Sequence, residues 1–183
     1  MQKEVLSMDF KFTTNYANNN ESNFDEALPA GTYEMVIKSV QEQATPGGAE
    51  AIHFDFVVRN DLDQALPNTN GKQHNRHLFF NEWKRKATNQ YSLKNLNAYM
   101  NAVGIPEGTT INSFNEFCQL MIGKPVRLDV TIQNDTYNGI TTKRNAVAPW
   151  GWHKSKFPNV QKLMVDPVPN AQPINIPDSD LPF

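Results

Sequence analysis

Alternation of apolar and polar positions predicts a β-hairpin near the start of the chain. Residues 32–40, TYEMVIKSV, alternate with the two-residue period of a strand buried on one face. Residues 51–59, AIHFDFVVR, alternate in the same way, and TPGG at 45–48 supplies the turn between them. The expected inward positions are Tyr33, Met35, Ile37, Ile52, Phe54, Phe56 and Val58, whereas His53, Asp55 and Arg59 are expected to face outward.

The remaining patterns predict a third strand, a helical segment and two more strands. An apolar run at 75–86 follows a polar loop, and apolar residues then recur at three- and four-residue spacing over 89–106 and 113–124. Strict period two returns at 125–135, and an Asn-Gly turn leads into a fifth strand that runs towards Val147. The helical segment therefore lies between the third and fourth strands.

Five antiparallel strands with a helix between the third and fourth resemble the OB-fold family in order and spacing. The resemblance implies a mainly β domain, a partly open five-stranded barrel, whose second and third strands and adjoining loops bind oligonucleotides. An open β-sandwich with a helical insertion is the alternative architecture.

The net charge of −2 conceals three blocks of opposite sign. Residues 1–71 hold 4 Lys/Arg and 11 Asp/Glu, residues 72–162 hold 13 and 5, and residues 163–183 hold none and 3. A basic central block beside an acidic end favours a polyanion site and a segment that competes for it, although an ordinary solvated surface has similar charges. From these blocks and the proline-rich end we expect three parts: an irregular arm at 1–30, a folded domain at 31–157 and a disordered tail at 158–183.

Other features indicate the compartment. The single cysteine, Cys118, cannot form an internal disulfide and fits a reducing environment. Neither an apolar run long enough to span a membrane nor a secretory signal is present, so a cytoplasmic protein without membrane contact is expected.

The stretch LFFNEWKRK combines aromatic rings with cations. In an extended strand, Phe79 and Trp83 share one face, and Lys84, Arg85 and Lys86 follow directly. Single-strand nucleic-acid binders use this combination, because every base has a π-face and every nucleotide a charge. Burial in the core is the alternative for the aromatic residues here, and it is the expectation for Phe80.

A second patch of the same kind lies in KRNAVAPWGWHKSK. Trp150 and Trp152 are two residues apart across Gly151, which predicts that they share one face. Cations surround them, so the stretch also suits a single strand of nucleic acid, unless one tryptophan closes the end of the barrel. The candidates here are Lys143, Arg144, Trp150, Trp152 and Lys154, with Tyr137 at the tip of the preceding hairpin.

Catalysis finds little support in the sequence. His74 and His77 are three residues apart, as metal ligands are in some sites, but no further metal-binding motif accompanies them. Phosphate-loop and nucleophile-elbow motifs are also missing. We therefore expect a protein that is not an enzyme and needs neither metal nor cofactor.

The last six residues resemble the tip of bacterial single-stranded DNA-binding proteins, which ends Asp-Asp-Asp-Ile-Pro-Phe behind a proline-rich linker. This chain ends Asp178, Ser179, Asp180, Leu181, Pro182, Phe183, so Ser179 removes one charge. The resemblance implies that Phe183 enters an apolar pocket on a replication, recombination or repair protein while the aspartates meet basic residues.

Residues 8–152 also resemble a family of small phage proteins from replication and recombination modules. Together these observations predict a sequence-independent single-stranded DNA-binding protein of a phage, in the cytoplasm of an infected bacterium. An adaptor that binds a recombinase or helicase and never touches DNA is the alternative, and assembly into a homo-oligomer is left open.

Overall fold

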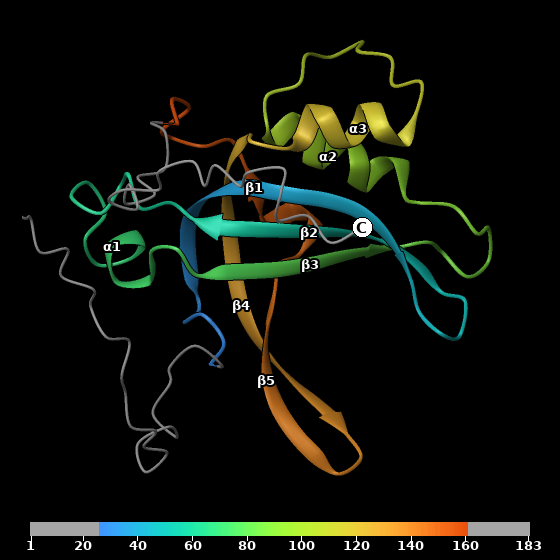
Figure 1. Ribbon diagram of the computed structural model, residues 1–183, viewed down its shortest axis with the longest axis horizontal. Coiled ribbons are helices and arrows are strands. Elements are labelled where there is room, and N and C mark those ends of the chain that lie inside the picture. The colour runs from blue at the N-terminus through green and yellow to red at the C-terminus, as the bar shows by residue number, and fades with distance from the viewer. Residues whose placement is uncertain (1–25, 161–183) are drawn as a thin grey trace, which may run out of the picture.

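The computed structural model describes residues 26–160 of the chain (Figure 1). Most of the expected N-terminal arm, nearly all of the expected tail, and the tip residues Asp178, Asp180, Leu181, Pro182 and Phe183 lie outside the described residues. Within the described part, no helix has the length and apolar character that a membrane crossing requires.

The strands and helices follow the order that the sequence predicts. Two short elements, α1 and β6, and one 3-10 turn, η2, were not expected. In chain order the elements are β1 (Gly31–Ala44), β2 (Glu50–Val58), α1 (Asn70–Gln73), β3 (His77–Trp83), α2 (Leu93–Ala102), α3 (Phe114–Met121), β4 (Pro125–Tyr137), β5 (Ile140–Ala146), η2 (Pro149–Gly151) and β6 (Trp152–His153).

The strands form one antiparallel sheet in the order β3-β2-β1-β4-β5, and β6 pairs with β4. Helices α2 and α3 lie together beside the sheet, between β3 and β4 in sequence (Figure 1). This confirms the OB-like architecture. Within residues 26–160 no ladder joins β3 to β5, so the sheet stays open between its two end strands.

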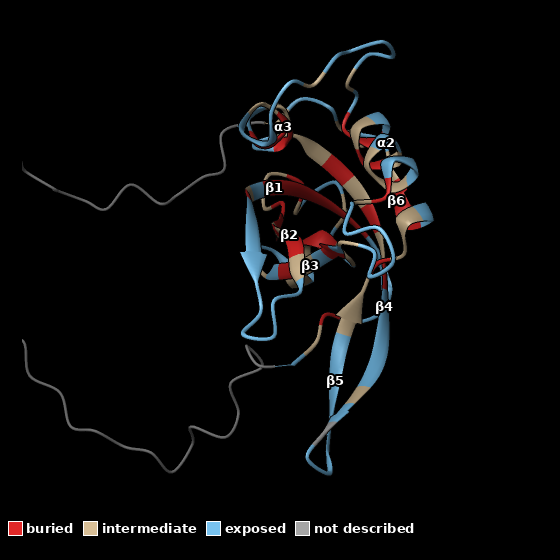
Figure 2. Cartoon of the chain, turned by 90° about the vertical axis from the view of Figure 1, so that its right-hand side faces the viewer, coloured by how far each residue is buried: buried red, intermediate tan, exposed pale blue. Residues whose placement is uncertain are grey.

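The β4–β5 hairpin extends well beyond the packed body of the protein. Figure 2 shows its far part exposed, whereas the parts of β1, β2 and β4 inside the body are largely buried. The hairpin therefore carries β5 along the open side of the sheet with both of its faces largely accessible.

The core is built on the inward face of β2, and Trp152 lies at its centre. The Trp152 ring stacks on Tyr99 with centroids 4.2 Å apart and meets the edges of Phe54 and Phe56 at 5.4 and 5.2 Å. Only 6% of Trp152 is exposed, against 82% of Trp150. The prediction that both tryptophans share an accessible face is therefore wrong for Trp152.

The geometry of η2 explains this correction. Residues two apart share a face only in extended backbone, but Trp150 lies in a 3-10 turn. Gly151 packs against β4 so closely that a Cβ there would lie 3.3 Å from the Asp129 carbonyl oxygen. The turn therefore sends one ring outward and the next into the core.

Arg59 is also buried, contrary to the outward position that alternation predicts. Its guanidinium pairs with Asp61 at 2.6 Å and donates hydrogen bonds to the carbonyl oxygens of Phe157 and Asn159 at 2.5 and 3.0 Å. These partners satisfy the buried charge, and they hold the chain against the sheet as far as Asn159.

A second buried charge joins β3 to α2. The Glu82 carboxylate lies in the core and accepts hydrogen bonds from Tyr99 Oη at 2.6 Å and Asn95 Nδ2 at 3.1 Å. Burial, followed by the hydrogen bond to Glu82, raises the pKa of Tyr99. Tyr99 thus stacks on Trp152 and also hydrogen-bonds the Glu82 carboxylate.

We expect Tyr99→Phe to lower the free energy of unfolding by about 1–3 kcal/mol, because it removes the shortest donor to a buried carboxylate. Chemical denaturation measures the change. Tyr91→Phe is the matched control, because Tyr91 Oη donates to Glu42 at 2.6 Å at the surface, where water replaces the lost partner. An equal loss of stability in both variants would contradict a stabilising role for the buried Tyr99–Glu82 hydrogen bond.

Candidate nucleic-acid interface

A groove of about 550 Å³ lies between β3 and β5, where the sheet fails to close. Phe79 and Trp83 line it from β3, and Lys143 and Arg144 line it from β5. The two stretches are about sixty residues apart in the sequence, yet they meet because they form the two ends of one open sheet. The groove therefore unites the first candidate patch with part of the second.

The aromatic side of the groove follows from the period of β3. Leu78 and Glu82 point into the core, and Phe80 packs against Tyr99 with ring centroids 5.7 Å apart, as expected for a core residue. The alternate residues Phe79 and Trp83 face outward and are 59% and 46% exposed. Four residues of strand place them about 13 Å apart. Two accessible rings thus line one wall of the groove.

Of the three cations that follow β3, Lys84 is already engaged. Its Nζ pairs with Glu50 and lies 3.3 Å from Glu42, over the ring of Tyr91. The hydrogen bond to Glu50 raises the pKa of Lys84. This corrects the expectation that Lys84 is open to phosphate, because acidic residues of the β1–β2 hairpin balance its charge.

Arg85 and Lys86 are exposed. Arg85 donates to Ser92 Oγ at 2.8 Å, which holds the guanidinium close to the start of α2. Lys86 has no ion-pair partner within the described part of the chain. Neither Arg85 nor Lys86 lines the groove, although both follow Trp83, which does.

The basic side of the groove belongs to the projecting hairpin. Lys143 is exposed, and Arg144, 71% exposed in its side chain, places Nε 2.9 Å from Asp135 on β4. An ion pair this exposed contributes little, so a phosphate can compete for the guanidinium. The backbone of Tyr137 pairs with Ile140 at the hairpin tip, and its side chain lies outside what the structure describes.

The structure separates the rest of the second patch from the groove. Trp150 and Lys154 are exposed but do not line it, and Trp152 is buried. His153 lies beside them and contacts Asp129 Oδ2 at 2.7 Å. A hydrogen bond from Thr32 and a weaker one from His153 lower the pKa of Asp129. This region is therefore a separate surface with one prominent ring.

Sequence reasoning missed the residues that hold segment 26–28, part of which lines the groove. Asn145 on β5 accepts from the Leu28 backbone nitrogen and donates to the Leu28 carbonyl oxygen, both at 2.7 Å. Arg76, just before β3, donates to the carbonyl oxygen of Glu26, which also lines the groove. Nothing in the sequence pattern signals these contacts, because they join segments distant in the chain.

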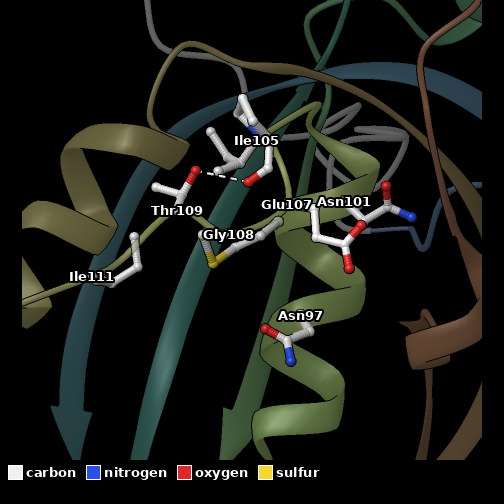
Figure 3. A pocket seen from close by; sticks show the side chains of 9 residues that line it. Asn97, Asn101, Ile105, Glu107, Gly108, Thr109 and Ile111 are labelled. Carbon is white, nitrogen blue, oxygen red and sulfur yellow. Dashed lines mark hydrogen bonds between the residues drawn. The ribbon is translucent and has the colours of Figure 1, made fainter.

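A second pocket, of about 560 Å³, lies between α2 and the loop that follows it (Figure 3). Its polar side chains are Asn97, Asn101, Glu107 and Thr109, and the Thr109 hydroxyl donates to the Pro106 carbonyl oxygen at 2.7 Å. The only charged side chain lining it is acidic. That charge disfavours a phosphate backbone, so this pocket is not the candidate nucleic-acid site.

The chain belongs to the family described as "Protein of unknown function (DUF669)", whose model matches residues 12–168. None of the curated proteins matches the sequence. Among solved structures, "Yeast RPA bound to ssDNA" is similar at 13% sequence identity and a TM-score of 0.36, covering 79% of this chain and 90% of that one.

Truncation of Trp152 and truncation of Trp150 should change the free energy of unfolding by very different amounts. Trp152→Ala removes the centre of the aromatic core and is expected to cost about 3–5 kcal/mol of stability. Trp150→Ala, at an exposed ring, should stay within about 0.5 kcal/mol of the parent. Urea denaturation of both variants checks the assignment, and the reverse order of stabilities would show that the wrong ring has been placed in the core.

Proposed function

We propose that this protein binds single-stranded DNA without sequence preference, in phage replication or recombination. The observation that carries the proposal is the groove between β3 and β5, where two exposed rings face two cations. Stacking recognises bases of any sequence, and cations recognise the backbone, so the combination suits unpaired strands.

In this proposal, one wall of the groove binds bases and the other binds phosphates. Bases stack on Phe79 and Trp83, each contributing about 1–3 kcal/mol. The two rings are about 13 Å apart, whereas neighbouring stacked bases rise only about 3.4 Å. The bases on the two rings are therefore not neighbours, and at least one nucleotide lies between them. Lys143 and Arg144 contact the phosphates from the opposite wall.

We further propose that the C-terminal tip recruits a replication, recombination or repair enzyme. Support comes from its resemblance to the tips of bacterial single-stranded DNA-binding proteins: Asp178 and Asp180 supply charge, and Leu181, Pro182 and Phe183 supply the apolar end. In the described part, the chain leads towards this tip from Asn159, which Arg59 holds. DNA binding and recruitment thus use separate parts of the chain.

A non-DNA-binding adaptor is the second candidate, and one observation favours it. Trp150 and Leu93 are 82% and 75% exposed and lie outside the groove. Large exposed apolar side chains are common at protein–protein contacts. The adaptor requires these residues and not the groove, so variants of the groove distinguish the two functions.

Titration of the full-length protein with oligo-dT at low salt, followed by fluorescence polarisation of a labelled oligonucleotide, tests the proposal. Phe79→Ala and Trp83→Ala should each weaken binding by about 5- to 150-fold, the equivalent of one lost stacking contact. Trp150→Ala, which removes a still more exposed ring outside the groove, should leave the affinity unchanged. If the parent protein fails to bind at low salt, the adaptor is favoured instead.

The salt dependence of binding should distinguish cations that contact DNA phosphates from cations that are already paired with carboxylates. Lys143→Gln and Arg144→Gln should each reduce the slope of log affinity against log salt by about 0.7, because each removes one phosphate contact. Lys84→Gln is the matched control, since Glu42 and Glu50 already neutralise Lys84. A slope that changes only in the Lys84 variant would place the backbone along the β1–β2 hairpin rather than along β5.

A further inference from the structure

The exposed ring of Phe79 contacts two imidazoles. His53, on β2, stacks on it with centroids 5.5 Å apart and an interplanar angle of 18°, and His77, two residues before it on β3, lies at 6.0 Å and 32°. His77 also lines the groove. A base stacked on Phe79 would therefore place its sugar and phosphate within reach of one or both imidazoles.

Each of the two imidazoles makes its hydrogen bond through its own Nδ1 atom. His53 Nδ1 lies 2.8 Å from Asn81 Oδ1, and His77 Nδ1 lies 2.7 Å from Asp55 Oδ1. Each partner is an oxygen that only accepts, so each Nδ1 carries the proton and donates it. Within residues 26–160, neither Nε2 atom has a hydrogen-bond partner.

The surrounding charges decide what these Nε2 atoms can do. Asp55 on β2 places a negative charge beside His77, and Glu26 contributes a second negative charge to the groove. Lys143 and Arg144 on β5 contribute two positive charges from the opposite wall, until a phosphate neutralises them. His53 faces the neutral Gln41 on β1 and Asn81 on β3.

We propose that His53 and His77 are phosphate-binding residues of this site and make its affinity for single-stranded DNA dependent on pH. The inference rests on the proposed function and adds to it. A neutral imidazole held in this way presents a lone pair at Nε2, which repels a phosphate oxygen. The protonated ring presents an N–H, which donates to that oxygen in a charge-assisted hydrogen bond.

The direction of the pH dependence follows from this difference. Because DNA binds the protonated form better, binding takes up protons, and affinity must rise as the pH falls. Imidazoles in general change charge between pH 5 and 8. Bound DNA in turn favours protonation of the same two rings, since the coupling is reciprocal.

The test is a titration of the full-length protein with oligo-dT at pH 5.5 and pH 8.0, at one ionic strength. We expect roughly tenfold tighter binding at the lower pH for each histidine that contacts a phosphate. His53→Gln and His77→Gln should each remove part of the increase, and the double variant most of it. His74→Gln is the matched control: His74 also pairs with an aspartate, at 2.8 Å, but its ring is not one of the two that contact Phe79, and it does not line the groove.

A second measurement needs no variant. Imidazole signals of the parent protein in NMR spectra, titrated with and without oligo-dT, should show the midpoints of His53 and His77 moving to higher pH on binding, while His74 stays in place. Binding that is equal at both pH values, or an increase that survives in the double variant, overturns this inference and leaves the proposed function intact. Absence of binding at both pH values overturns both.

Discussion

The stacking of Trp152 on Tyr99 is the interaction on which the rest of the arrangement depends. It joins β6, α2 and the inward rings of β2 in one cluster, and Tyr99 extends that cluster to the buried carboxylate of Glu82. With the interior filled in this way, the outward positions of β3 are left to Phe79 and Trp83. The same packing that completes the core thus supplies the rings of the groove.

Because the sheet is open, the cations of β5 lie across a groove from those rings. A closed barrel would pair β3 with β5 and leave no space between them, whereas here β5 runs out along the projecting hairpin and faces β3 across the groove. The N-terminal segment is held there through Asn145 and Arg76. The side chains on the two walls differ in kind: aromatic and imidazole groups on β3, cations on β5.

The sequence predicts the elements well because their signals are local. Alternation places β1 to β5, and the apolar spacing over 113–124 places α3, which Ser113 caps by accepting from the Glu116 nitrogen at 3.1 Å. Phe79, Trp83, Lys143 and Arg144 were predicted by type, but their convergence depends on which strands end the sheet. The burial of Arg59 and the ion pair of Lys84 escaped prediction because the Phe157 and Asn159 carbonyl oxygens and the Glu50 carboxylate are distant from them in the sequence. The assignments at the C-terminal tip remain predictions.

The anchorage of residues 155–159 has a mechanical consequence. Arg59 holds the carbonyl oxygens of Phe157 and Asn159, and the Glu34 carboxylate accepts from the Ser155 hydroxyl at 2.6 Å. Tension applied to the chain beyond Asn159 would load these polar contacts, on β1 and directly after β2, first. The strands that border the groove would bear that force only after the anchor gave way, so traction on the chain beyond Asn159 leaves the groove undisturbed while the anchor holds.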